Sequence, residues 1–292
     1  LDTLRTTVGL RADQYRFDVS SDTPANSGQA AALMVTPKLG VVLGPWAQTE
    51  FYANYGHGFH SNDARGTTIR VNPDARSADY RGMVDRVRPL VRARGSEVGL
   101  RSAPAAGWLT SLAVWRLDVA SELLFIGDAG ITEPSRPSRR QGVEWGSSWT
   151  SVAGVTVDAD VAMSTARFRN AEAAGSRIPG AIGRVASMGA TLDRAGRWFG
   201  GLRVRYFGSR PLIEDNSVRS ASSTLTNLKV GYRVDRHITL SLEVLNLFNR
   251  TLSDIDYYYE SQLRTEMAPV ADFHSHPSEP RSLRLAVRMA LQ

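Results

Sequence analysis

The stretch VTVDADVAMS (residues 155–164) alternates apolar and other side chains over ten consecutive positions. Its odd-numbered positions are all apolar, whereas Asp158 and Asp160 stand at even-numbered ones. Successive side chains of a β-strand point to opposite faces of the sheet. The spacing therefore predicts a strand with one apolar face and one charged face.

This pattern is repeated from end to end of the chain. Apolar residues occupy every second position, or nearly so, in 4–12, 49–59, 227–234, 238–244 and 283–291. No comparable stretch has the i, i+3, i+4, i+7 spacing of an amphipathic helix. The sequence thus predicts an all-β protein.

The predicted connections alternate between long and short. Short turns fall near 44–48, 104–107, 150–151, 194–196 and 235–236. Long polar segments lie at 19–32, 61–94, 129–138, 167–182, 209–221 and 250–279. This arrangement gives about twelve strands in an antiparallel up-and-down order, as in transmembrane β-barrels with short turns on one side and long loops on the other.

The apolar phase of the predicted strands carries almost no charge, and the other phase carries Arg5, Arg11, Asp158, Asp160, Arg203, Arg205, Lys229, Arg233, Glu243, Arg284 and Arg288. Burying so many ions without partners would be strongly unfavourable, so this face must contact water. In a wide barrel it would line the lumen, with the apolar face on lipid. Aromatic residues near the predicted strand ends favour the barrel, because such residues form girdles at membrane interfaces. A soluble β-sandwich that binds carbohydrate or protein is the alternative.

Composition excludes several classes of protein. The 292 residues include no cysteine, which excludes disulfides, thiolate zinc sites and cysteine nucleophiles. The net charge of +6 is spread along the chain rather than clustered, so we expect no nucleic-acid partner. No apolar run is long enough for a transmembrane helix. The chain has no initiator Met and no visible signal peptide, and we expect it to be a fragment.

Five segments resemble the C-terminal barrel half of TonB-dependent outer-membrane receptors. They follow one another in that family's order and span nearly the whole chain: TEFYANYGHGFHSNDARG (49–66), GSEVGLRS (95–102), WRLDVASELLFIGDAGITEPSRPSRRQGVEWG (115–146), LSLEVLNLFNRTLSDIDYYY (240–259) and HPSEPRSLRLAVRMALQ (276–292).

The resemblance implies a transmembrane antiparallel up-and-down β-barrel of about 22 strands closed by an N-terminal plug. Residues 1–292 would then form part of that barrel domain, with about twelve C-terminal strands and without the plug. In the closing strand, Leu283 through Leu291 would face lipid, and Arg284 and Arg288 the lumen. Such receptors usually end on an aromatic residue in the lipid-facing phase, so the terminal Gln292 suggests a chain cut at both ends.

The resemblance also implies a function. The expected location is the outer membrane of a Gram-negative bacterium, and the expected activity is TonB-dependent uptake of a scarce large solute, with a ferric siderophore or related metal chelate favoured. The partners would be the inner-membrane TonB complex, contacted through the absent N-terminal part, outer-membrane lipid and the metal chelate. We expect neither a cofactor nor a resident metal, and no enzymatic activity. The alternative is a passive porin-like channel whose Arg-rich lumen attracts anions.

The candidate ligand-binding residues lie in predicted loops and on the predicted lumenal face: His57, His60, Arg203, Arg205, Tyr257, His274 and His276. Imidazoles suit transition metals, and an H-x-H spacing on a strand directs both rings to one face. If both histidine pairs faced one vestibule, they could bind a metal or its chelate; otherwise they are hydrogen-bonding surface groups. The arginines could attract carboxylate-rich chelates, but pairing with Asp158, Asp160 and Glu243 is the favoured interpretation.

Overall fold

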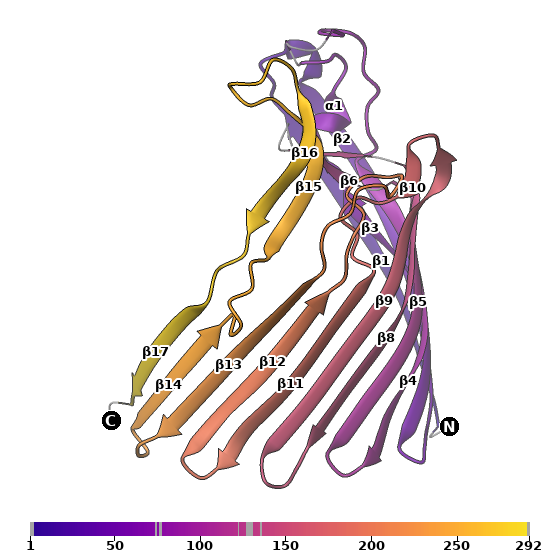
Figure 1. The fold of residues 1–292 in the computed structure, drawn as a ribbon. Coiled ribbons are helices and arrows are strands. Elements are labelled where there is room, and N and C mark those ends of the chain that lie inside the picture. Colours follow the sequence, from indigo (N-terminus) through magenta and orange to yellow (C-terminus); the bar gives the residue numbers. More distant parts are fainter. Residues whose placement is uncertain are drawn as a thin grey trace.

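The computed structural model describes residues 3–73, 75, 78–121, 123–126, 131–134 and 136–290. In the described part of the chain, one antiparallel sheet of thirteen strands includes a continuous row of twelve, each hydrogen-bonded to the next one in space (Figure 1). In spatial order these are β1 (Leu4–Val19), β2 (Gly28–Trp46), β3 (Thr49–Ser61), β4 (Leu90–Ala105), β5 (Trp108–Val119), β8 (Ser138–Thr150), β9 (Val155–Glu172), β11 (Arg184–Ala195), β12 (Trp198–Phe207), β13 (Ser223–Arg233), β14 (Ile238–Leu245) and β17 (Ser282–Met289). The all-β class and the expected number of barrel strands are confirmed.

The remaining elements lie at the end of the sheet that carries the long connections. They are η1 (Pro24–Asn26), α1 (Ala64–Thr68), β10 (Gly175–Arg177), which pairs with β9, and the two hairpins β6 (Leu123–Ile126) with β7 (Ile131–Pro134) and β15 (Ser253–Ser261) with β16 (Val270–Pro277). In the described part of the chain, no helix has the length and apolar character needed to cross a membrane.

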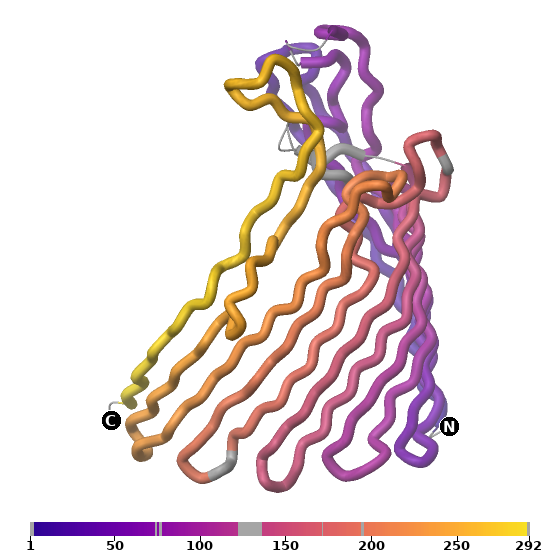
Figure 2. Tube along the Cα trace, in the orientation of Figure 1, coloured from indigo at the N-terminus to yellow at the C-terminus, as the bar shows by residue number. Residues whose placement is uncertain are grey.

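The connections separate into two ends, as the sequence predicts. The short turns lie together at the bottom of Figure 1, and the long connections rise at the top. The Cα trace follows the same alternation through the described residues (Figure 2). Segment 250–279, expected to be loop, instead contains the hairpin β15–β16. The edges of the sheet are β1 and β17.

The two faces of the sheet differ in exposure because the sheet is curved. On β4, Arg92, Arg94, Ser96 and Val98 are exposed, while the residues between them are buried or half-buried. We call the face that carries Val98 outward and the opposite face inward. Apart from charged residues such as Arg92, Arg94 and Asp118, which the expected alternation did not place there, the outward face is largely apolar and bare: Val8 is 81%, Leu10 76% and Leu285 78% exposed.

Outward aromatic side chains mark the short-turn end. Trp108 lies opposite Trp149 in the β5–β8 register, and the rings of Trp198 and Tyr232 are 4.8 Å apart between β12 and β13. This placement is typical of the aromatic girdle of a membrane barrel.

Buried apolar side chains gather at the other end, beneath the long connections: Leu90, Val91, Val119, Phe168, Ile178 and Leu212. No second sheet packs face to face on the described strands, so the β-sandwich alternative is wrong. No described segment of the chain covers the outward face of the sheet. The expected outward position of Leu291 lies outside the described residues.

Candidate ligand-binding face

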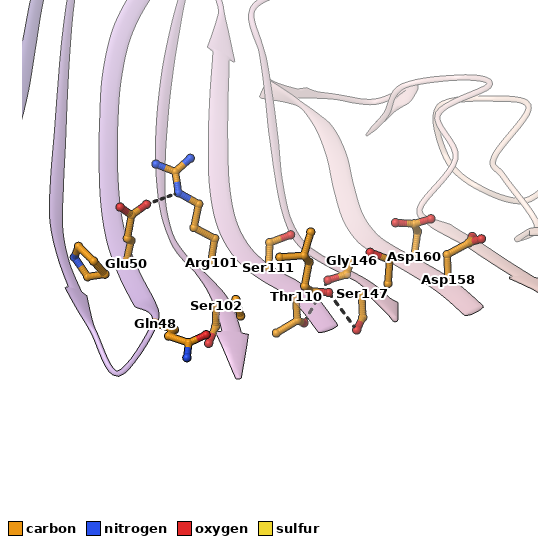
Figure 3. Close-up of a pocket in the computed structure, with 14 residues that line it drawn as sticks. Gln48, Glu50, Arg101, Ser102, Thr110, Ser111, Gly146, Ser147, Asp158 and Asp160 are labelled. Atoms are coloured by element: carbon orange, nitrogen blue, oxygen red, sulfur yellow. Dashed lines mark hydrogen bonds and ion pairs between the residues drawn. The ribbon is translucent and has the colours of Figure 1, made fainter. Parts of the chain in front are cut away.

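Charged side chains of the inward face form ion pairs across neighbouring strands. Near the short turns, Glu50 on β3 lies directly opposite Arg101 on β4 and accepts a hydrogen bond from its Nε at 2.6 Å (Figure 3). The same carboxylate pairs with Arg5 on β1. One acid on β3 thus bridges an arginine on β1 and an arginine on β4.

A groove of about 540 Å³ runs along the sheet beside this cluster. Glu50 and Arg101 lie at one side of it, and Asp158 and Asp160 of β9 at the other (Figure 3). The groove is open to solvent, so water and ions can reach the charged side chains that flank it.

A second ion pair spans an intervening strand. Arg203 on β12 donates from Nη2 to Asp158 Oδ1 on β9 at 2.8 Å and from Nη1 to Ser187 Oγ on β11 at 3.0 Å. Gly189 of β11 lies in register between the two charged residues. A Cβ there would stand 2.6 Å from Arg203 Nη2 and 2.7 Å from Asp158 Oδ1, so the glycine makes room for the pair.

Arg205 differs from its neighbour Arg203. It lies two residues further along β12 on the same inward face, opposite Ser187 and Leu225. No described carboxylate forms an ion pair with it. Asp160 of β9 lies in the same register row, across Ser187, so the Arg205 guanidinium is two strands from an acid and remains open to an approaching anion.

The last strands carry their own charge pattern. Arg233 pairs with Asp193 at 2.6 Å and lies 4.7 Å above the ring of Phe199. That ring covers Gly231, where a Cβ would approach it to 2.1 Å. Further along, Lys229, Glu243 and Arg284 stand opposite one another on β13, β14 and β17. The predicted pairing of arginines with acids is confirmed for Arg203 and Asp158, while Arg233 pairs with an acid that the sequence interpretation did not name.

The structure separates His57 from His60. The two residues are three positions apart on β3, so they lie on opposite faces and do not face one vestibule together. His57 Nδ1 accepts a hydrogen bond from Arg92 Nη1 at 2.8 Å, and its Nε2 is 3.1 Å from Tyr55 Oη. With Nδ1 accepting, Nε2 carries the proton and donates to the tyrosine oxygen. Both ring nitrogens of His57 are thus occupied.

The structure brings Tyr257, His274 and His276 together on the hairpin β15–β16. Tyr257 stands opposite His274, and His276 stands opposite Ile255 on the same face. Tyr259 shares that face and stacks on His274, with ring centroids 3.8 Å apart and planes 10° apart. The hairpin β15–β16 projects above the sheet at the long-loop end (Figure 1).

Groups of three or more His, Asp and Glu side chains placed to hold a metal ion are absent from the described residues.

Two carboxylates in the long connections are held ionised by local hydrogen bonds. The guanidinium of Arg65 and the Arg65 backbone N–H lower the pKa of Asp63 at the start of α1. The backbone N–H and hydroxyl of Ser217 lower the pKa of Asp215. Both acids organise their own loops, and neither geometry resembles a catalytic pair.

Sequence reasoning missed Arg101, Gly189 and Tyr259, and did not assign Glu50 a role. Alternation alone places Glu50 and Arg101 on a polar face, but their contact depends on the β3–β4 register. The stacking of Tyr259 on His274 depends on the hairpin, which was expected to be loop. A register drawn from the short turns could have found the Glu50–Arg101 pair.

The fold and its charged inward face define a segment of a membrane-barrel wall. The family model described as TonB dependent receptor-like, beta-barrel matches residues 1–247. The chain belongs to this family of TonB-dependent receptor barrels. Barrels of this family are outer-membrane proteins of Gram-negative bacteria.

Solved structures with the same fold cover 99% of the chain. They include the ferric-catecholate import receptor Fiu of E. coli K12, at 19% identity and a TM-score of 0.70, and the ferric yersiniabactin uptake receptor FyuA of Yersinia pestis, at 16% and 0.74. The copper transporter OprC matches at 17% identity and a TM-score of 0.73. The chain spans 42% of the Fiu chain, 43% of the FyuA chain and 47% of the OprC chain.

Proposed function

We propose that this chain forms the C-terminal part of the barrel wall of an outer-membrane receptor that imports a metal chelate, such as a ferric siderophore, with energy from the inner-membrane TonB complex. The observation that carries the proposal is the family's barrel sheet with a bare apolar outward face and a charged inward face. Structural relatives that import ferric chelates or copper support a metal-containing cargo.

We assign residues 1–292 to one barrel domain, beyond the span of the family model. The support is β17, which pairs with β14 along all eight of its residues and continues the same two-faced pattern. The short turns would face the periplasm and the long connections the exterior, as in other outer-membrane barrels.

Capture of the chelate would begin at the hairpin β15–β16. Its face of Tyr257, Tyr259, His274 and His276 offers aromatic surface for stacking and imidazole hydrogen bonds. Arg205 lies deeper, on the inward face, and its free charge suits a carboxylate or catecholate group of the chelate. His60, on the inward side of β3, is a further candidate contact at the rim, whereas both nitrogens of His57 are already engaged.

The test is uptake by cells that carry the full-length receptor. Deletion of its gene should slow accumulation of a radiolabelled ferric siderophore under iron limitation, and loss of TonB should have the same effect. Uptake that is unchanged by the receptor deletion would contradict the proposed cargo. Uptake that depends on the receptor but not on TonB would instead support a passive channel.

Single substitutions test whether Arg205 contacts the chelate. Arg205→Gln should raise the chelate concentration needed for half-maximal uptake, and Arg205→Lys should retain most of the affinity. Arg236→Gln removes one exposed charge at a short turn and serves as the matched control. Equal affinity in the Arg205→Gln and Arg236→Gln receptors would remove Arg205 from the site.

A further inference from the structure

The hairpin β15–β16 receives no backbone support from the main sheet. Its two strands pair with each other and with no other described strand. Figure 1 shows the hairpin standing above the sheet, joined to it by the segments that lead from β14 and to β17. A lone two-stranded hairpin is only marginally stable in water. Contacts outside its own ladder must therefore set the direction in which the hairpin points.

The connection between β12 and β13 supplies such a contact. We call this connection, residues 208–222, the bridging segment. Its Arg210 forms an ion pair from Nη2 to Asp256 Oδ2 on β15 at 3.5 Å, and the same Nη2 lies 3.5 Å from the carbonyl oxygen of Asp254. The side chains of Arg210 and Asp256 are only 13% and 12% exposed. An ion pair shielded from water in this way is costly to break, because each charge would be left without its partner.

The ion pair lies on the back of the hairpin, away from its aromatic face. Asp256 stands opposite Ser275 on β16, and Ser275 Oγ donates to Asp256 Oδ1 at 2.8 Å. Successive side chains of a strand alternate between faces, so Tyr257 and His274 lie on the other side of the hairpin. Arg210 therefore holds the hairpin without occupying the face that offers aromatic surface and imidazoles.

The bridging segment has a defined shape of its own. The backbone N–H of Leu212 donates to the carbonyl of Val218 at 2.9 Å, and that of Ser220 donates to the carbonyl of Arg210 at 3.0 Å. The backbone N–H of Arg210 in turn donates to Ser220 Oγ at 3.1 Å. Leu212 is 5% exposed. Arg210 thus projects from a closed and partly buried loop.

The far side of the bridging segment is attached to the segment around β10. The backbone N–H of Arg177 donates to the carbonyl of Glu214 at 2.9 Å. The backbone N–H of Gly180 donates to the carbonyl of Pro211 at 2.8 Å. Gly175 has a φ of +114°, and a Cβ there would stand 2.3 Å from the Glu214 carbonyl oxygen. The two backbones are therefore in direct contact.

Arg136 fastens this attachment with its side chain, which is 14% exposed. Its Nη2 pairs with the Glu214 carboxylate, and its Nη1 donates to the carbonyls of Asn170 and Gly175 at 3.1 and 3.2 Å. Its guanidinium also lies 4.1 Å from the ring centroid of Phe168. One arginine thus joins the start of β8, the end of β9 and the bridging segment.

We propose that the bridging segment holds the hairpin β15–β16 in one orientation, with Arg210 as the positioning residue and Arg136 as its anchor. A hairpin that is already ordered loses less conformational freedom when it meets a ligand, so it binds more tightly. The inference rests on the proposed role of the hairpin in capturing the chelate. It adds that the capture surface is set before the chelate arrives.

The first test measures the orientation without any chelate. Spin labels are attached at Val152→Cys, in the β8–β9 turn, and Leu263→Cys, between β15 and β16, in a full-length receptor with no other cysteine. Pulsed electron paramagnetic resonance in bilayers should give one narrow distance distribution, and Arg210→Gln should broaden it. Arg250→Gln is the matched control, since Arg250 is exposed and its side chain forms no ion pair with any described residue. Equally narrow distributions in Arg210→Gln and the control would overturn the positioning role, whatever the cargo.

A double-mutant comparison assigns the effect to the ion pair. Asp256→Asn should broaden the same distribution, and Arg210→Gln combined with Asp256→Asn should broaden it no further than either change alone. Arg210→Lys should keep most of the narrow population, because it retains the charge. Broadening that adds up fully in the double variant would contradict the pairing of Arg210 with Asp256 as the cause.

The second test measures uptake of the radiolabelled ferric siderophore. Arg210→Gln should raise the half-saturating concentration about tenfold, as expected if the competent orientation is populated about a tenth of the time. The maximal rate should stay unchanged, and Arg250→Gln should match the wild-type receptor in both quantities. A loosened hairpin with an unchanged half-saturating concentration would overturn the link between orientation and capture. Uptake that needs no receptor would overturn the proposed function itself, while the distance measurement would still decide the positioning role.

Discussion

On β9, Val157, Val161 and Met163 point outward and are held mainly by backbone pairing, whereas Asp158 of the same strand points inward and pairs with Arg203. Outward side chains need only be apolar and of suitable size, because fluid lipid tails can adapt to them. Inward side chains must meet specific partners from other strands. One strand therefore carries an outward face that tolerates changes between apolar residues and an inward face that requires particular side chains. Substitutions on the two faces should differ in their effect on stability.

The largest expected difference comes from adding a charge to each face in turn. Val161→Arg, outward near the middle of β9, should destabilise the full-length receptor by about 2–4 kcal/mol, the cost of an arginine near the bilayer midplane. The adjacent Ala162→Arg faces inward opposite Glu144 and should stay within about 0.5 kcal/mol. Equilibrium unfolding in lipid vesicles measures both. Similar losses in the two variants would contradict the assignment of faces.

The second-largest loss of stability is expected from overpacking on the inward face. Gly231→Ala places a methyl group where the Phe199 ring lies, at 2.1 Å, and should cost about 1–3 kcal/mol through overpacking. Gly58→Ala is the matched control, because no atom lies within 4 Å of the added Cβ. Thermal unfolding of the two variants gives the comparison. A Gly231→Ala receptor as stable as Gly58→Ala would mean that Phe199 does not cover the glycine.

A smaller effect is expected at the ion pair spanning β11. Gly189→Ala should displace the Arg203 guanidinium from Asp158 and cost about 0.2–1 kcal/mol, the usual worth of a partly exposed pair. Once Gly189→Ala is present, Arg203→Gln should add little, because the pair is already broken. A double-mutant cycle measures this coupling. Fully additive losses would show that the two changes act independently.

The smallest effect is a pH dependence at the β13–β14 turn. The backbone N–H groups of His237 and Ile238 donate to Asp235 and lower the pKa of its carboxyl. Because the folded-state pKa lies below the unfolded one, this stabilisation is complete above the unfolded value and is lost as the pH falls through the folded value. Thermal unfolding should show an acid-side loss in the wild-type receptor that Asp235→Asn lacks. Parallel pH profiles would rule out this contribution.

The difference between the faces also explains what the sequence could predict. Period-two alternation reports which residues share a face, so the strands, their number and the two ends of the sheet could be inferred from it. The pairing of Glu50 with Arg101, or of Asp158 with Arg203 over Gly189, depends on register between strands far apart in sequence. No local pattern in the sequence carries that information.

The histidines illustrate the same limit. The H-x-H spacing correctly placed His274 and His276 on one face, since their separation of two matches the strand period. A metal-binding role for His57 and His60 would require both to face one vestibule, but their separation of three puts them on opposite faces because β3 extends through both. Whether the two histidines share a face depends on where β3 ends, and strand ends are poorly marked in sequence.

The central claim is that the outward face contacts lipid and the inward face contacts water or the barrel's contents. Residues 1–292 contain no cysteine, so single cysteines can be introduced from Val157 to Ser164 and spin-labelled one at a time in a full-length receptor whose other segments carry none. Collision with oxygen, which concentrates in lipid, and with a water-soluble nickel complex should be measured in reconstituted bilayers. The account predicts a period of two, with Val157, Ala159, Val161 and Met163 accessible to oxygen and the residues between them shielded from it. A profile without alternation, or with the two sets exchanged, would contradict it.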